Sequence, residues 1–93
     1  MRRLQLVGSL PVVVMAPLRG VPSEHDEIRE VTHEMASNII AMGGTCTGEH
    51  GIGMGKIELL VEETGENAVS VMRKIKQTLD PNWILNPGKV INY

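Results

Sequence analysis

Residues 43–55, with the sequence GGTCTGEHGIGMG, hold six of the ten glycines of this 93-residue chain and place one Glu-His pair, Glu49-His50, between them. Glycine loses more conformational freedom on folding than any other residue, so a cluster this dense indicates tight backbone geometry or close approach to a ligand. The segment also interrupts helical periodicity. It therefore divides the chain into helical parts on either side.

The part before this segment has the pattern of an amphipathic helix. Ser23 with Asp26 three residues later is an acidic variant of a capping signal, and acidic residues suit the first turn of a helix. Apolar residues then recur with the spacing of one helical face, at Ile28, Val31, Met35, Ile39 and Met42. We expect this helix to stop at Gly43-Gly44.

The part after the segment predicts a short helix at 56–63, closed by Gly65, and a third helix that ends at Asp80-Pro81. We expect four apolar residues of the third helix to face inward: Val69, Met72, Ile75 and Leu79. Its basic residues Arg73, Lys74 and Lys76 are interpreted as a solvated helix end. Residues 84–90 form a turn between two short apolar runs, and Trp83 is expected to pack over the third helix. The fold class predicted is α+β, mostly helical.

Residues 1–22 differ from the rest in composition. Residues 1–23 carry three arginines and no acid, whereas all eleven acids follow. The apolar run at 10–18 resembles a targeting segment, but two prolines break it and it is short of the ~20 residues a bilayer requires. A weak strand at 12–15 is the preferred interpretation. We predict no transmembrane segment.

Length and composition exclude other classes. A chain of 93 residues makes at most one small domain with marginal stability, which leaves open a non-catalytic helical module that docks on a partner. A net charge of −2 gives no reason to expect a nucleic-acid partner. The one cysteine, Cys46, excludes an internal disulfide, and no neighbour in sequence activates its thiol.

The glycine-rich segment matches no common nucleotide or zinc motif. It lacks the third glycine of the dinucleotide fingerprint, Lys56 is followed by Ile57 rather than Ser or Thr, and His50 has no histidine four residues away. Adjacent residues of an extended or turning backbone point in different directions, so we expect Glu49 and His50 to address different partners. Histidine suits proton abstraction from a hydroxyl. The alternative is that Glu49 caps local amides and His50 is a solvated loop residue.

Two motifs together carry a family resemblance. GGTCTGEHGIGMGK at 43–56, followed by LDPNWILNPGKV at 79–90, resembles the C-terminal end of the FAD-linked oxidases that act on D-2-hydroxy acids, in particular the cytochrome-linked D-lactate dehydrogenases of mitochondria. The resemblance covers roughly residues 23–92, so the domain division predicted is a divergent segment at 1–22 and the FAD-linked oxidase C-terminal region at 23–93.

The resemblance implies a place and a role for each site residue. The fold implied is a C-terminal fragment of the substrate (cap) domain of a vanillyl-alcohol-oxidase-type flavoprotein. By resemblance, Glu49 is a ligand of a divalent metal (zinc or manganese) and His50 is the catalytic base for the substrate hydroxyl. Gly48, Gly51 and Asn86 approach the FAD cofactor. The resemblance further implies a mitochondrial location and cytochrome c or another electron acceptor.

The chain departs from the family pattern in one respect. Two further metal ligands of the family come from a His-x-Gly-Asp-Gly-Asn-x-His type segment before the first helix, where residues 11–22 contain no histidine. We expect no FAD-binding domain within these 93 residues, and His25 and His33 are interpreted as solvated helix residues. We therefore expect the chain alone to bind neither FAD nor metal and to be inactive. The function predicted is that of the C-terminal part of an FAD-dependent oxidoreductase. The alternative is a non-catalytic helical module or split-enzyme subunit.

Overall fold

A computed structural model describes residues 22–93, which form three helices and no strand. The helices are α1 (Pro22–Ala41), α2 (Ile57–Thr64) and α3 (Glu66–Leu79). All three were predicted from sequence, with ends that agree within the usual uncertainty of one or two residues. The predicted strand at 12–15 lies outside the described residues, so the strand component of the α+β class stays a prediction.

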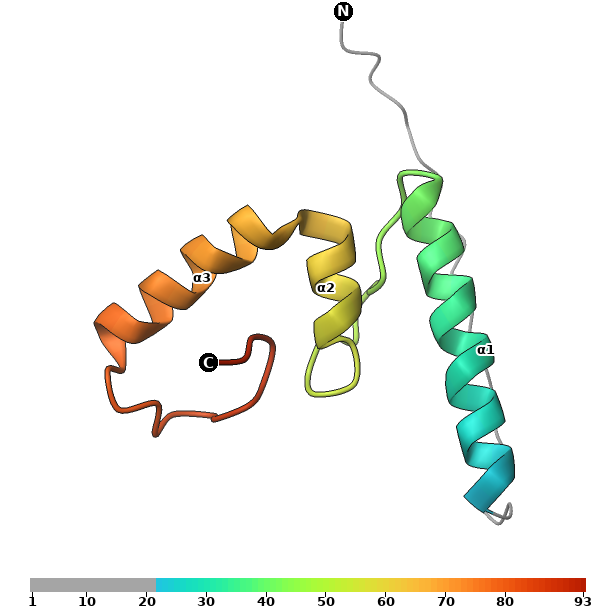
Figure 1. Cartoon of the computed structure of the whole chain (residues 1–93), viewed down its shortest axis with the longest axis horizontal. Coiled ribbons are helices and arrows are strands. Elements are labelled where there is room, and N and C mark those ends of the chain that lie inside the picture. Colours follow the sequence, from blue (N-terminus) through green and yellow to red (C-terminus); the bar gives the residue numbers. More distant parts are fainter. Residues whose placement is uncertain (1–21) are drawn as a thin grey trace, which may run out of the picture.

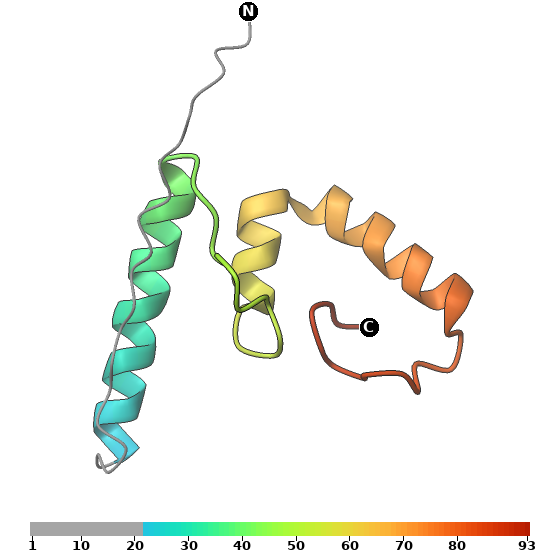
Figure 2. The same cartoon turned by 180° about the vertical axis from the view of Figure 1, so that it is seen from behind.

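The helices follow one another without closing into a bundle. α2 lies beside α1 and also contacts α3, and α1 does not contact α3. Figure 1 shows that the chain turns sharply between α2 and α3, and that the segment after α3 curls back toward α2. Figure 2 shows the same order from behind. Gly65 makes the sharp turn, because its φ of 83° is a conformation that other residues rarely adopt.

The core lies in the angle between α2 and α3. Leu60, Val69 and Ile91 are its buried residues, and Val69 is only 1% exposed. Four partly buried residues pack around them: Ile52, Val61, Met72 and Trp83. The core therefore joins both helices to the glycine-rich segment through Ile52 and to the C-terminal segment through Ile91.

The apolar face predicted for α3 is only half correct. Val69 is buried and Met72 partly buried, but Ile75 is 56% and Leu79 79% exposed. Ile75 and Leu79 form with Val71 a stripe of residues four apart, which lies on one side of the helix. The prediction failed there because α2 and the C-terminal segment cover only part of the apolar arc.

The basic residues of α3 do not form a solvated end as predicted. Arg73 pairs with Glu66 and donates from Nε to the Asn92 carbonyl at 2.9 Å. Lys76 pairs with Asp80, and only Lys74 is exposed as expected. Two of the three therefore bind the C-terminal part of the chain instead of solvent.

α1 contacts α2, and two of the contacts between them are polar. Ser37 donates a hydrogen bond to Glu62 at 2.9 Å, and His33 Nε2 lies 4.0 Å from Glu58 Oε2. Apolar positions of α1 are at best partly buried, and the predicted face residues Val31 and Met42 are 53% and 80% exposed. None of the helices in residues 22–93 combines the length and apolar character needed to cross a bilayer.

The end of α1 shows why glycine is required at position 44. A Cβ placed on Gly44 would lie 2.5 Å from Ile39 Cγ2 and 2.9 Å from the Ile39 carbonyl oxygen. The Gly44 N–H instead donates to that carbonyl at 2.8 Å, which satisfies an end group of the helix. The predicted stop at Gly43-Gly44 is thus confirmed.

Candidate functional site

The glycine-rich segment is fixed at its start to α2. Cys46 is buried, and its backbone N–H donates to Glu63 Oε2 at 2.9 Å. This contact spans seventeen residues of sequence and comes from the side chain of an α2 residue that no sequence motif singled out. It holds the segment against the helix just before Gly48.

Ionisation at this anchor favours a neutral thiol beside a charged carboxylate. Burial, and next the hydrogen bond with Glu63, raise the pKa of Cys46 from 9.0 to about 11. The backbone N–H of Cys46 holds the pKa of Glu63 below its usual value. A thiol that stays protonated is a poor nucleophile, which agrees with the inert role expected for Cys46.

The far end of the segment is fixed to the C-terminal segment. The Val90 N–H donates to the Gly53 carbonyl at 2.7 Å, and Ile52 packs against the core that contains Ile91. The two motifs recognised in the sequence, at 43–56 and 79–90, therefore touch in the folded chain. Their spacing in sequence did not show that they meet through backbone atoms.

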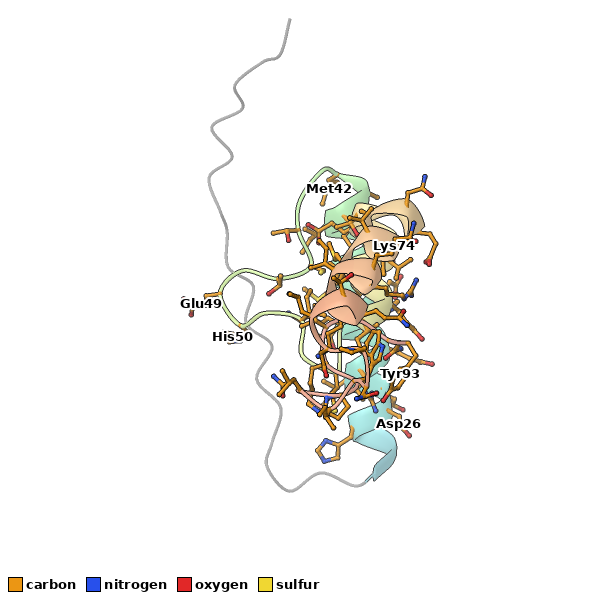
Figure 3. All side chains as sticks on the ribbon, turned by 90° about the vertical axis from the view of Figure 1, so that its left-hand side faces the viewer. Asp26, Met42, Glu49, His50, Lys74 and Tyr93 are labelled. Atoms are coloured by element: carbon orange, nitrogen blue, oxygen red, sulfur yellow. The ribbon has the colours of Figure 1, made fainter. Side chains whose placement is uncertain are left out.

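Between these anchors lies the tip that carries Glu49 and His50. Their side chains are 91% and 80% exposed, and Figure 3 shows the pair on a loop that stands away from the helices. His50 Nε2 lies 3.6 Å from Glu49 Oε1, so the structure brings the two together. The turn of the loop places both side chains at its outer end. That they address different partners stays a prediction.

Comparison with known proteins assigns this loop to a family. Residues 8–90 match the model of the C-terminal domain of the FAD linked oxidases. The chain belongs to this family. The match begins before the predicted boundary between 1–22 and 23–93, and that division stays a prediction.

Two of the similar proteins are named as D-lactate dehydrogenases. The chain is 51% identical over 73 residues to a probable mitochondrial D-lactate dehydrogenase of Danio rerio, covering 75% of this chain and 15% of that protein. It is 49% identical over 73 residues to the mitochondrial D-lactate dehydrogenase [cytochrome] of Arabidopsis thaliana, covering 75% of this chain and 13% of the relative. The chain thus spans only about one seventh of these relatives.

The glycines beside the pair leave room for the flavin that the family name implies. A Cβ added at Gly48 or Gly51 would meet nothing within 4 Å, so residues 22–93 do not block the backbone on either side of the pair. The enclosed Thr47 hydroxyl finds no hydrogen-bond partner within the described part of the chain. The open glycines and the Thr47 hydroxyl are compatible with contact to a ligand or to a part of the protein other than residues 22–93.

A complete metal site is not formed by the described residues. No group of three or more His, Cys, Asp or Glu side chains within 22–93 could hold a metal ion. Glu49 and His50 offer two donors, and His25 and His33 lie on α1, where both are exposed. A metal on Glu49 would need further ligands from outside residues 22–93.

Asn86 lies in the C-terminal segment, on an exposed turn. Its φ is 49°, and Trp83 and Val90 of the same segment also have positive φ values of 52° and 67°. Trp83 packs on the core as expected, with its ring 4.7 Å from that of Tyr93 and 5.7 Å from Lys76 Nζ. The proposed cofactor contact of Asn86 stays a prediction.

Proposed function

We propose that this chain is the C-terminal part of an FAD-dependent oxidoreductase that oxidises D-lactate or a related D-2-hydroxy acid, and that the chain alone is inactive. The observation that carries the proposal is the exposed Glu49–His50 tip, held at both ends and flanked by open glycines, in a member of the FAD linked oxidase family. The names of the similar D-lactate dehydrogenases support the substrate class.

His50 is proposed as the base of the reaction. Its exposed ring can take the proton of the substrate hydroxyl as the bond between carbon 2 and its hydrogen breaks. Glu49, 3.6 Å away, can steady the imidazolium that forms, in addition to its predicted role as a metal ligand. FAD, when bound, supplies the acceptor for the hydride from carbon 2, and the product is a 2-oxo acid.

The backbone at two glycines and one side-chain amide are proposed to contact the cofactor. Gly48 and Gly51 are proposed to lie against the flavin, because no side chain blocks them, and Asn86 is proposed as a side-chain contact. We further propose a mitochondrial location, as in the names of the relatives, with cytochrome c or another carrier as electron acceptor.

A chimera tests the proposal. Residues 23–93 would replace the matching segment of the Arabidopsis thaliana enzyme, whose 49% identity makes the exchange conservative. We expect the purified chimera to bind FAD and to reduce a dye with D-lactate. His50→Gln should lower kcat by about 100-fold or more and keep the flavin spectrum. The matched control is His33→Gln on α1, which should leave kcat unchanged. Normal turnover by His50→Gln would refute the role of the base.

The isolated chain provides the complementary measurement. Residues 1–93 with added FAD and a divalent metal should show neither bound flavin absorbance nor D-lactate-dependent dye reduction. Observation of both would overturn the inactivity that we propose for the chain alone.

A second candidate is a non-catalytic helical module or split-enzyme subunit. The exposed stripe of Val71, Ile75 and Leu79 on α3 favours it, because this chain leaves an apolar surface beside its own core uncovered. Sedimentation checks it: a monomer that unfolds cooperatively, and that Ile75→Lys does not change, would count against a docking role.

A further inference from the structure

We propose that Lys76 and Asp80 are positioning residues for the Glu49–His50 tip, acting through residues 84–91, which we call the strap. The inference deepens the proposed function and rests on it for its link to catalysis. Its structural part stands on contacts that do not involve FAD or substrate.

The first residues of the strap are held by a buried carboxylate, that of Asp80. Asp80 is 6% exposed and accepts hydrogen bonds from the backbone N–H groups of Ile84 at 3.2 Å and Leu85 at 2.9 Å. Lys76 Nζ binds Asp80 at 2.5 Å and also donates to the Leu85 carbonyl at 2.6 Å. Leu85 is thus bonded on both sides of its backbone, so the ion pair sets the direction in which the strap leaves α3.

The strap ends on the glycine-rich segment. The Val90 N–H reaches the Gly53 carbonyl at 2.7 Å, and the next residue, Ile91, is buried in the core. Figure 1 shows this segment returning from the end of α3 toward α2. Gly53 lies three residues after His50, so this bond fixes the far side of the tip.

The strap is held in a strained form. Val90 has a φ of 67°, which is unfavourable for a β-branched residue, whereas Asn86, with a φ of 49°, is of a residue type that tolerates this conformation. A strained backbone of this kind persists only where its surroundings impose it. Since Val90 carries the bond to Gly53, loss of the bonds at Asp80 should release the strap and this contact with it.

The opposite side of the tip has an independent anchor. The Cys46 N–H bonds to Glu63 of α2 and shares no partner with the strap. Release of the strap should therefore free the Gly53 side and leave the Cys46 side in place. This difference separates a positioning role from a general loss of stability.

Amide hydrogen exchange followed by NMR on the whole chain tests the structural part. Lys76→Ala and Asp80→Asn should each speed exchange of the Val90 N–H by about tenfold or more, with the Cys46 N–H and the amides of α2 unchanged. Lys76→Arg, which keeps the charge and the donors, should restore most of the protection. Lys74→Ala is the matched control, because Lys74 is the exposed base two residues away.

Two results would overturn the proposal. Unchanged exchange at Val90 would show that the ion pair does not hold the strap. A rise by the same factor at Val90, at Cys46 and throughout α2, including complete unfolding of a variant, would show that Lys76 and Asp80 serve only general stability.

The chimera tests the link to catalysis. Lys76→Ala should lower kcat for D-lactate by about tenfold, leave KM nearly unchanged and keep the flavin spectrum, with Lys76→Arg close to wild type. An unchanged kcat would refute the link. If the chimera with the unaltered segment does not turn over D-lactate, the proposed function fails, whereas hydrogen exchange still decides whether the strap positions the tip.

Discussion

Alkylation of Cys46 by iodoacetamide at pH 8 should be about 100-fold slower in the folded chain than in the chain unfolded in urea. Burial and the hydrogen bond with Glu63 raise the pKa of this thiol from 9.0 to about 11. The reactive thiolate is then about 0.1% of the folded protein, against about 9% at the ordinary value. Limited access of the reagent to a buried sulfur slows the reaction further.

The assay is simple because the sequence contains a single cysteine. Mass spectrometry follows the rate of adduct formation in buffer and in urea. Glu63→Ala removes the acceptor of the Cys46 N–H and should bring the rate in buffer much closer to the rate in urea. Glu62→Ala is the matched control, since its partner is Ser37 of α1.

Equal rates in buffer and in urea would refute the reasoning, because the segment would then not be docked on α2. The same acceleration by Glu62→Ala and Glu63→Ala would show that the specific bond to Glu63 does not hold the segment.

Three further predictions concern the fold. Val69→Ala should lower the free energy of unfolding by about 2 kcal/mol in urea titrations, because it removes two buried methyl groups. Val71→Ala, at a half-exposed site, should change it by about 0.5 kcal/mol or less. Equal effects of the two substitutions would contradict the assigned core. Hydrogen bonds from Lys76 and the backbone hold the pKa of Asp80 below its usual 3.8, so the stability from this group is present above pH 3.8 and is lost as the pH falls further. Asp80→Asn should therefore weaken the fall of the melting temperature with decreasing pH. A fall equal to that of the unaltered chain would count against this role of Asp80. Gly44→Ala should lower the melting temperature measured by calorimetry, because the added Cβ has no room beside Ile39. Gly48→Ala, with open space around the added Cβ, should leave the melting temperature nearly unchanged. A larger effect of Gly48→Ala would contradict the close packing described at Gly44.

Local features of the sequence were sufficient to predict the helices. The glycine pair at 43–44, Gly65 and Asp80-Pro81 each end or separate a helix through backbone geometry that any surroundings would impose. The same reasoning failed for Ile75 and Leu79, because an apolar pattern shows which side of a helix prefers burial but not whether the chain supplies enough partners to cover it.

The candidate site was predicted in part. The Glu49-His50 pair and its glycines stood out in the sequence, and residues 8–90 match the family that their pattern resembles. The contacts that hold the pair were missed, because Glu63 belongs to no motif and Val90, although part of the motif at 79–90, acts through its backbone N–H. Both form long-range hydrogen bonds that the sequence does not show. The cationic residues of α3 were also misinterpreted, since a Lys or Arg near a helix end looks the same in sequence whether solvent or a returning strap receives it.

The sequence by itself determined the helices, the glycine-rich loop and the family, because each depends on residues close together in the chain or on a fixed motif. Only the tertiary structure decided that the two motifs meet, with Val90 bonded to Gly53, and that Glu49 and His50 share one exposed tip. The physical reason is that these contacts join residues far apart in sequence, and their formation depends on the core of Leu60, Val69 and Ile91 that folds the chain back on itself.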